Sequence, residues 1–399
     1  MRRVGGRCIA EIYHVIAILL KAVTIRISYR INLLLEQEYF RFNFRKLFIH
    51  LRMKLPVLLS ALLFVIACKN TGKYPVVSTF AGNGIMKWAD GKTAEASFAN
   101  LMGIAIDNAG NLYIADSHNN RIRKISLDGN VTTLAGNGTV GSLDGKGASA
   151  SFFYPTGVAV DKKGNVYVAD THNSLIRKIS PDGMVTTFAG RRADSSNRGV
   201  DSSSARFDNP AGVAVDTNGN VYVSDWANDI IRKIDSYGKV ENIAGSTGGP
   251  GAKDGTGSSA SFYLPWGIAV DMAGNIYVAD SYNNMIRKIS PDGVVVTLAG
   301  SKASGSSDGQ GAKASFLHPA GIAVTKAGDL YVADMGNHKI RKISPGGFVT
   351  TIAGNGLRGA TNGRDTMASF YKPYGVAIDK DGSIYVADYQ NNLVRKISF

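Results

Sequence analysis

One tetrapeptide pattern recurs six times along the chain: tyrosine, a small aliphatic residue, alanine or serine, and aspartate. The successive tyrosines are 54, 55, 55, 54 and 54 residues apart. A constant period of this length exceeds any single helix or strand and predicts an array of similar structural units. Side chains present in every unit are expected to serve the fold, so individual chemistry is expected where the units differ. The copies begin at Tyr113, Tyr167, Tyr222, Tyr277, Tyr331 and Tyr385.

Each unit reads as four short strands. In the second unit the apolar or alternating runs cover residues 157–161, 165–170, 175–180 and 184–188. The tight turn at residues 181–183, Pro-Asp-Gly, joins the last two runs, because proline starts such a turn and glycine supplies positive φ. Four antiparallel strands followed by a connector of about 20 residues are typical of a propeller blade.

The two ends of the repeat array complement each other. The last unit stops at Phe399 without a fourth strand, and residues 76–82, Val-Val-Ser-Thr-Phe-Ala-Gly, resemble the fourth strand of the preceding unit at residues 349–354. Pairing these ends removes an edge that would otherwise invite aggregation. The sequence therefore predicts an all-β, six-bladed propeller of four-stranded antiparallel blades over residues 76–399, closed by its N-terminal strand.

Three short motifs that recur among the units resemble the NHL repeat family. They are Gly-[Ile/Val]-Ala-[Ile/Val]-Asp, Gly-Asn-[Ile/Val]-Tyr-Val-Ala-Asp and Asn-x-x-Ile-Arg-Lys-Ile, and residues 337–340, Asn-His-Lys-Ile, come close to the tripeptide that names the family. The resemblance covers residues 76–399 and implies a six-bladed propeller. It implies no single activity, because propellers host many unrelated functions.

The charge and the cysteines narrow the possible functions. Residues 1–69 hold 12 Lys and Arg against 3 acidic residues, whereas residues 70–399 hold 33 against 28, so most of the net charge of +14 lies outside the repeats. A mildly basic body is an ordinary solvated surface, and we expect no nucleic-acid partner. Because the only cysteines are Cys8 and Cys68, the repeats can form neither a disulfide nor a thiolate metal site.

Residues 53–68 have the features of an export signal. Met53-Lys54 precedes an apolar run over residues 55–66, too short for a full bilayer span. The run ends in Val-Ile-Ala-Cys, which resembles the lipobox of bacterial lipoproteins and implies cleavage before Cys68 and lipidation of its thiol. We therefore expect an anchor in the bilayer of the bacterial cell envelope, periplasmic or at the cell surface, with residues 69–75 as a tether. The alternatives are a buried helix or a single transmembrane anchor.

Residues 1–52 lie upstream of this complete signal and are basic and hydrophobic without clear periodicity. The simplest interpretation is that translation starts at Met53 and that the upstream residues are an extension of the gene model. The rival interpretation is a membrane segment over residues 13–27, although Lys21 and Arg26 interrupt it.

Six aspartates end the second strands, and an arginine follows each of them seven residues later. This ring could bind a metal, or each aspartate could cap its own loop and pair with the arginine across the hairpin. Repetition in six copies favours the structural role, so we predict no metal and no cofactor. The repeated Asp-Gly-x-Gly segments of the connectors are interpreted as turns. The residues are Asp116, Asp170, Asp225, Asp280, Asp334 and Asp388, with Arg123, Arg177, Arg232, Arg287, Arg341 and Arg395.

The positions that vary between units gather on one face. Because antiparallel strands alternate in direction, the loops between second and third strands emerge on the same face as the connectors. Aromatic and histidine side chains on this face are candidates for binding a sugar, a peptide or a protein; the alternative is that they pack against the connectors. The ligand-binding candidates are Trp226, Trp266, Tyr282, Tyr374, Tyr389, His118 and His172.

The sequence favours a monomeric binding scaffold over an enzyme. From residue 70 onward the chain has only two glutamates, Glu95 and Glu241, and four histidines. Two imidazoles without a third ligand make a poor zinc site, and no nucleophile with its base can be assigned, so no catalytic residue is predicted. The main alternative is a metal-assisted lyase or lactonase-like enzyme at the mouth of the central channel. A further alternative is a structural component of the envelope without a small ligand.

Overall fold

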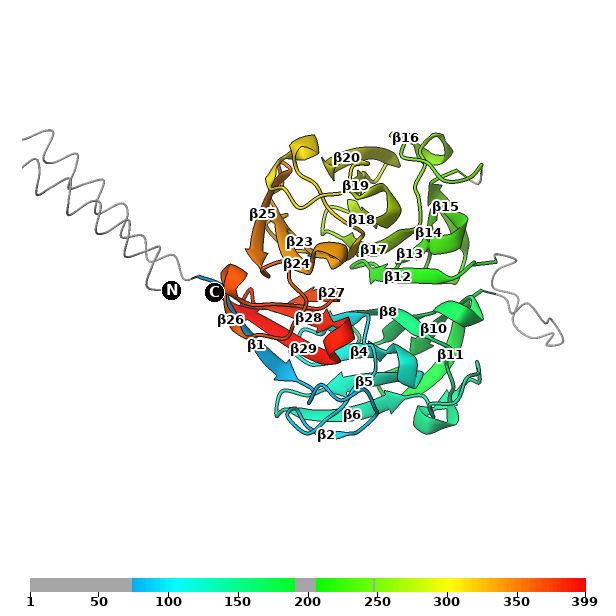
Figure 1. Ribbon diagram of the computed structural model, residues 1–399. Coiled ribbons are helices and arrows are strands. Elements are labelled where there is room, and N and C mark those ends of the chain that lie inside the picture. The colour runs from blue at the N-terminus through cyan, green and yellow to red at the C-terminus, as the bar shows by residue number, and fades with distance from the viewer. Residues whose placement is uncertain (1–73, 191–205, 247) are drawn as a thin grey trace, which may run out of the picture. The chain divides into compact units, whose positions relative to one another are not determined.

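The computed structural model describes residues 74–190, 206–246 and 248–399. The predicted signal, Cys68 and the questioned residues 1–52 lie outside the described residues. Six antiparallel sheets are arranged around a common centre, which confirms the six-bladed propeller (Figure 1). Within the described ranges, no helix combines the length and the apolar character needed to cross a bilayer.

Blades are numbered 1 to 6 from residue 104 onward, and each contributes four strands from the centre outward. The innermost strands are β3 (Ile104–Ile106), β8 (Pro155–Val160), β12 (Pro210–Val215), β17 (Pro265–Val270), β22 (Pro319–Val324) and β27 (Pro373–Ile378). The second strands are β4 (Leu112–Asp116), β9 (Val166–Asp170), β13 (Val221–Asp225), β18 (Ile276–Asp280), β23 (Leu330–Asp334) and β28 (Ile384–Asp388).

The outer half of each blade continues this order. The third strands are β5 (Arg121–Ile125), β10 (Leu175–Ile179), β14 (Ile230–Ile234), β19 (Met285–Ile289), β24 (Lys339–Ile343) and β29 (Leu393–Ser398). The fourth strands are β6 (Asn130–Ala135), β11 (Met184–Ala189), β15 (Val240–Ala244), β20 (Val294–Gly300), β25 (Phe348–Ala353) and, in blade 6, β1 (Val76–Ala81).

The connectors add an edge strand that the sequence did not predict. In five sheets a two-residue segment pairs with the fourth strand, at the place where the sequence indicated a turn. These strands are β2 (Gly91–Lys92), β7 (Gly145–Lys146), β16 (Gly255–Thr256), β21 (Gly309–Gln310) and β26 (Gly363–Arg364). One turn of 3-10 helix follows four of them: η2 (Gly147–Ser149), η5 (Gly257–Ser259), η7 (Gly311–Lys313) and η9 (Asp365–Met367).

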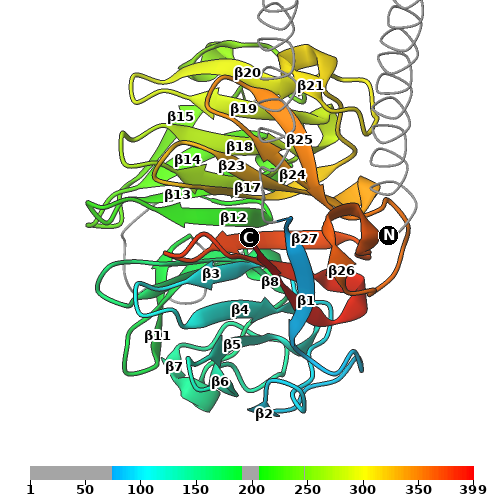
Figure 2. The ribbon, with the colours of Figure 1, turned by 90° about the vertical axis from the view of Figure 1, so that its left-hand side faces the viewer.

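The ring closes as expected. β1 pairs antiparallel with β29, with Val77 opposite Ile397 and Thr79 opposite Arg395. Figure 2 shows β1, in blue, beside the red strands of the C-terminal blade. Strands from the two ends of the propeller thus share one sheet, so unfolding either end removes a strand from blade 6.

A glycine in each innermost strand allows the blades to meet at the centre. The innermost strands contact one another in a closed cycle from β3 through β27 and back to β3. A Cβ added at Gly212 would lie 2.3 Å from the carbonyl oxygen of Trp266 in the next blade, and one at Gly375 would lie 2.4 Å from that of Met102. The equivalent residues are Gly103, Gly157, Gly212, Gly267, Gly321 and Gly375, whose added Cβ atoms would all lie 2.1–2.4 Å from such an oxygen.

The hydrophobic core is divided among the blade interfaces. One cluster joins Ile104 and Ile114 of blade 1 to Tyr385 and Val394 of blade 6, and each of the other five clusters likewise joins two neighbouring blades. The stabilising apolar contacts therefore lie between repeats as well as within them, as in other repeat architectures.

In five blades the buried Asp–Arg pair fixes the preceding connector to its blade. Arg123 donates to the Asp116 carboxylate (2.7 Å) and, through its other terminal nitrogen, to Asp90 in the connector (2.7 Å). Its guanidinium also lies 5.2 Å from the ring centre of Phe98, which is fully buried. Burial raises the pKa of Asp116, while Arg123 and the backbone N–H of Ala99 oppose this shift. The repeated aspartates and arginines thus hold the loops in place.

The central glycines provide a test of the packing. Replacing Gly212 by alanine forces a Cβ against a backbone carbonyl, and overpacking of this kind costs typically 1–3 kcal/mol. We expect Gly212→Ala to lower the free energy of unfolding by about 2 kcal/mol or more in denaturant titrations. The control is Gly346→Ala, because an added Cβ there meets no atom within 4 Å. An equal decrease in the free energy of unfolding in both variants would show that the close contact at Gly212 does not determine stability.

Candidate functional site

The loop face consists of the turns that join the second and third strands, together with the connector ends that precede the innermost strands. Each turn begins directly after a strand-ending aspartate and forms one turn of 3-10 helix. These are η1 (Ser117–Asn119), η3 (Thr171–Asn173), η4 (Trp226–Asn228), η6 (Ser281–Asn283), η8 (Met335–Asn337) and η10 (Tyr389–Asn391). In blade 2 the first residue of the innermost strand, Pro155, pairs with Asp170 beside η3. Both sets of variable positions therefore meet on one face.

A continuous chain of aromatic rings crosses this face. The ring centres of Trp226 and Trp266 are 5.8 Å apart, those of Trp266 and Tyr374 are 5.3 Å apart, and those of Tyr374 and Tyr389 are 5.2 Å apart. These rings come from blades 3, 4 and 6, and we call them the aromatic cluster. The indole nitrogen of Trp226 is buried and has no hydrogen-bond partner among the described residues.

Blade 2 continues the aromatic cluster with Tyr154. A hydrogen bond to Tyr389, together with burial as the largest cause, raises the pKa of the Tyr154 hydroxyl. The Tyr154 ring stacks on His172 with centres 4.8 Å apart, and it lies 5.2 Å from the ring of His118. Burial lowers the pKa of both histidines. The imidazoles are thus favoured in their neutral form, which suits stacking and hydrogen bonding better than it suits an ion pair.

Tyr282 also belongs to this face. Its ring centre lies 4.7 Å from that of His318 and 5.3 Å from that of Tyr263. Burial raises the pKa of Tyr374, and Tyr389 and Tyr282 contribute to the shift. Tyr282 is therefore close enough to influence the aromatic cluster.

All seven candidates predicted from the sequence thus lie on this face. Tyr154 and His318 make equivalent contacts but were not among the candidates. The signal that identifies Tyr154 is its position: it occupies the slot directly before the proline of an innermost strand, where other blades have Asn209, Leu264 or Lys372. An aromatic side chain in that slot, next to a histidine-bearing turn, is unusual within this chain.

Two polar departures from the repeat support the cluster. Ser224 stands where five blades have alanine, and its hydroxyl donates to the carbonyl oxygen of Trp266. It also accepts the N–H of Gly212 (2.8 Å). In blade 2, Thr156 and Thr171 share a hydrogen bond of 2.7 Å, and Thr156 donates to the carbonyl of Ala211 (2.8 Å). These hydroxyls tie neighbouring innermost strands together beneath the aromatic rings.

The central channel itself is too narrow for an organic ligand. The cavity among the innermost strands holds about 60 Å³ and is lined by the six central glycines together with side chains such as Met102, Trp266 and Tyr374. Organic ligands need pockets of roughly 300 Å³ or more. A ligand on this face would therefore lie across the mouth of the channel, against the aromatic cluster. In the described part of the chain, no three His, Cys, Asp or Glu side chains come together in a group able to hold a metal ion.

Hydrogen bonds between neighbouring blades hold the turns of the loop face against the connector of the next blade. The residue after each of the six turns has left-handed φ, 51° at Asn120 and 56° at His338. The Asn120 side chain accepts the N–H of Tyr154 in the next blade (2.9 Å). In blade 5 the imidazole of His338 takes this role, because its Nδ1 accepts the N–H of Lys372 (3.1 Å). Asp229, Asn284 and Asn392 make the same contact in blades 3, 4 and 6. His338 is therefore a structural residue of the blade 5–6 interface.

Comparison with known proteins identifies the repeats. The NHL repeat model matches residues 98–125, 207–229, 316–343 and 370–397, and the teneurin NHL domain model matches residues 141–204 and 249–309. These matches agree with the family resemblance of the sequence.

Two curated relatives and one solved structure show the extent of the similarity. The chain is 34% identical to the chloroplastic protein SUPPRESSOR OF QUENCHING 1 of Arabidopsis thaliana over 64% of its own length, but spans only 26% of that protein. It is 31% identical to NHL repeat-containing protein 2 of Bos taurus, over 73% of this chain and 45% of that protein. An auxiliary nutrient binding protein from Bacteroides thetaiotaomicron superimposes with a TM-score of 0.62 at 19% identity, covering 81% of this chain and 76% of that one.

The role of His338 gives a test based on pH. Burial, and then the charges of Arg358 and Lys372, lower the pKa of His338 below its usual value of 6.5. As the pH falls below about 6.5, the unfolded chain binds this proton more readily, so the folded state loses stability. We expect His338→Asn to remove this part of the acid sensitivity, because asparagine supplies the same acceptor in blade 4.

The measurement is the melting temperature of both proteins between pH 7.5 and pH 5.0. One hydrogen bond is worth about 1 kcal/mol, so in a domain of this size the drop in Tm should be smaller in His338→Asn by about 1–2 °C. His118 and His172 titrate in both proteins and cancel in the comparison. Identical drops would show that the Nδ1 contact does not contribute to stability.

Proposed function

Because the chain is a six-bladed propeller built from NHL repeats, we propose that it is an exported, lipid-anchored binding scaffold that captures a sugar, a peptide or a protein on its loop face. The observation that carries the proposal is the aromatic cluster, which gathers non-repeated rings from four blades at the mouth of a filled channel. Large aromatic side chains held on a rigid scaffold contribute most to binding interfaces. The nutrient-binding propeller of Bacteroides shares the fold alone, so it adds only that this architecture can carry such a role.

The rigidity of the site favours binding without rearrangement. Trp266 and Tyr374 lie in strands whose backbone meets the central glycines, and neither strand can shift without moving its neighbour. The hydroxyls of Tyr154 and Tyr389 and the neutral imidazoles of His118 and His172 supply polar contacts around apolar rings. Apolar faces with a few fixed polar groups are what sugars and peptides recognise.

The same proposal assigns the protein to the bacterial cell envelope. Cys68 is acylated and inserted in the bilayer, residues 69–75 form a short tether, and the propeller is a monomer. Its partners are a ligand or a protein of the envelope, without nucleic acid. The support is the apolar run over residues 55–66 followed by Val-Ile-Ala-Cys.

The binding proposal predicts the behaviour of a double variant. Trp266→Ala with Tyr374→Ala removes the centre of the aromatic cluster, and losing two such anchors weakens binding at least tenfold, about 1.4 kcal/mol or more. The assay is an array of immobilised oligosaccharides and short peptides, with thermal melting to verify the fold. The control is Tyr237→Ala, since Tyr237 is 90% exposed in the tight turn between β14 and β15. Undiminished capture by the double variant would remove the aromatic cluster from the site.

The anchoring proposal is tested separately. In a bacterial host fed an alkyne-tagged fatty acid, the protein should carry the label and Cys68→Ser should lose it. Tyr237→Ala is the control, because it keeps Cys68 and changes only an exposed turn residue, so it should leave the label in place. In mass spectrometry the mature protein should begin at Cys68. A peptide from residues 1–52 would contradict the interpretation of that segment as an extension of the gene model.

A further inference from the structure

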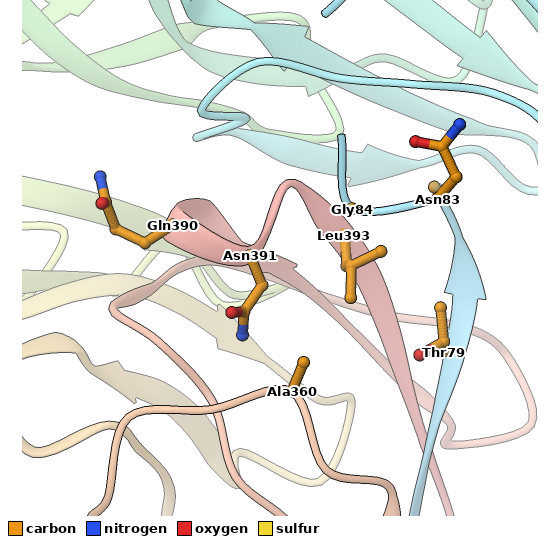
Figure 3. A pocket seen from close by; sticks show the side chains of 8 residues that line it. Thr79, Asn83, Gly84, Ala360, Gln390, Asn391 and Leu393 are labelled. Carbon is orange, nitrogen blue, oxygen red and sulfur yellow. The ribbon is translucent and has the colours of Figure 1, made fainter. Parts of the chain in front are cut away.

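An open cleft, which we call the seam cleft, borders the strand pair that closes the ring. It has a volume of about 510 Å³ and lies where β1 ends and η10 leads into β29. In Figure 3, Thr79, Leu393 and Ala360 border this space from three separate segments of the chain. Asn83 and Asn391 also line it. The seam cleft is far larger than the central channel, and the aromatic cluster contributes none of its lining.

Blade 1 fills the equivalent space with its own side chains. The guanidinium of Arg121 lies 4.2 Å from the ring centre of Trp88, in the geometry of a cation–π contact. It donates to the backbone carbonyls of Asn119 (3.1 Å) and Asn137 (2.8 Å). The indole N–H of Trp88 donates to the hydroxyl of Thr133 (3.0 Å). One cation and one aromatic ring thus occupy this place in blade 1.

The strand register identifies the residue of blade 6 that replaces Arg121. Arg121 lies opposite Asp116 at the start of β5, and Leu393 lies opposite Asp388 at the start of β29. Both aspartates belong to the repeated buried pairs. Leu393 therefore occupies the arginine position but offers no charge and no hydrogen-bond donor.

A second comparison identifies the residue of blade 6 that is equivalent to Trp88. Trp88 directly precedes Ala89, whose carbonyl accepts the buried arginine of blade 1. Ala360 directly precedes Thr361, whose carbonyl accepts the buried arginine of blade 6 in the same way. Ala360 therefore stands where blade 1 has the indole. The seam cleft is the space that an arginine and a tryptophan fill in blade 1.

The acceptors that bind Arg121 are still present in blade 6. The carbonyls of Asn391 and Asn83 correspond to those of Asn119 and Asn137, since both pairs occupy the same repeat positions. Among the described residues, no donor is bonded to either carbonyl of blade 6. Two carbonyls without a bonded donor, on residues that line an open cleft, favour a group with several N–H donors.

Blade 5 also places a cation at this position. Lys339 begins β24 opposite Asp334, at the same register as Arg121 and Leu393. Its ammonium donates to the hydroxyl of Ser306 (2.6 Å). Two blades thus place a positive charge at this register, whereas Leu175, Ile230 and Met285 stand opposite the equivalent aspartates of blades 2, 3 and 4.

We propose that the seam cleft binds an arginine side chain of a peptide ligand. The guanidinium donates to the carbonyls of Asn83 and Asn391, as Arg121 does within blade 1, and an adjacent aromatic side chain of the ligand occupies the space above Ala360. A planar guanidinium with five donors fits two backbone carbonyls better than an ammonium does. This site is separate from the loop-face ligand and requires neither that ligand nor the lipid anchor.

The test uses the full chain and the dipeptide acetyl-Arg-Trp-amide. Titration calorimetry should give one site, and the citrulline analogue, which keeps the shape without the charge, should bind at least tenfold more weakly. The double variant Leu393→Arg with Ala360→Trp rebuilds the contents of blade 1, so it should melt no lower than the wild type and should bind the dipeptide at least tenfold more weakly. Equal binding by this variant, or equal binding of the citrulline analogue, would overturn the proposal.

The reverse variant offers a gain of site. Arg121→Leu with Trp88→Ala should open a second cleft in blade 1 and raise the stoichiometry from one dipeptide to two. If this variant does not fold, the variant in blade 6 still decides the question. Trp266→Ala with Tyr374→Ala is the control, because it changes the loop face alone and should leave dipeptide binding unchanged. Loss of binding in this control would place the dipeptide on the aromatic cluster and overturn the proposal.

Discussion

The pairing of β1 with β29 is the constraint on which the rest of the structure depends. It joins residues that are more than 300 positions apart, Val76 and Ser398, in one sheet. Without it, β29 would present an open edge and blade 6 would lack its fourth strand. The innermost strands would also lose the closure that brings Gly375 against the Met102 carbonyl of blade 1. A propeller of this kind is thus stabilised as a ring. Blade 6, which contains strands from both ends of the repeats, makes the contacts with blade 1 that close it.

Within the ring, repetition separates structural residues from functional ones. Each buried arginine pairs with a buried aspartate and packs on a phenylalanine, and in five blades it also bonds connector carbonyls, as Arg123 does with Asp116, Phe98 and Ala89. Charges committed in this way are unavailable for chemistry, because removing a partner would leave an uncompensated buried charge. Function is left to the positions where the blades differ. On the loop face these hold the aromatic cluster, and at the seam they hold Leu393 and Ala360.

The blades also serve as references for one another. His338 takes the role that asparagine has in blade 4, and Leu393 takes the place of Arg121 in blade 1. Equivalent positions can be compared within this one chain, because all six blades share the same strand register. They distinguish a residue that keeps the contact of its equivalents, as His338 does, from one that lacks the contacts of a single other blade, as Leu393 lacks those of Arg121.

The sequence by itself determined the number of blades, the strand order and the closing segment, because a period of 54–55 residues and the missing last strand admit one closed arrangement. It also indicated the Asp–Arg pairs and the face on which Trp226, Trp266 and Tyr374 gather. Only the tertiary structure decided which rings touch, that Tyr154 joins them, that the channel is filled, and that the connectors add edge strands. These facts depend on distances between blades far apart in the chain, which a periodic pattern does not specify. The seam cleft is the clearest case, because its lining residues 79, 82–84, 360, 390, 391 and 393 meet only when the ring closes.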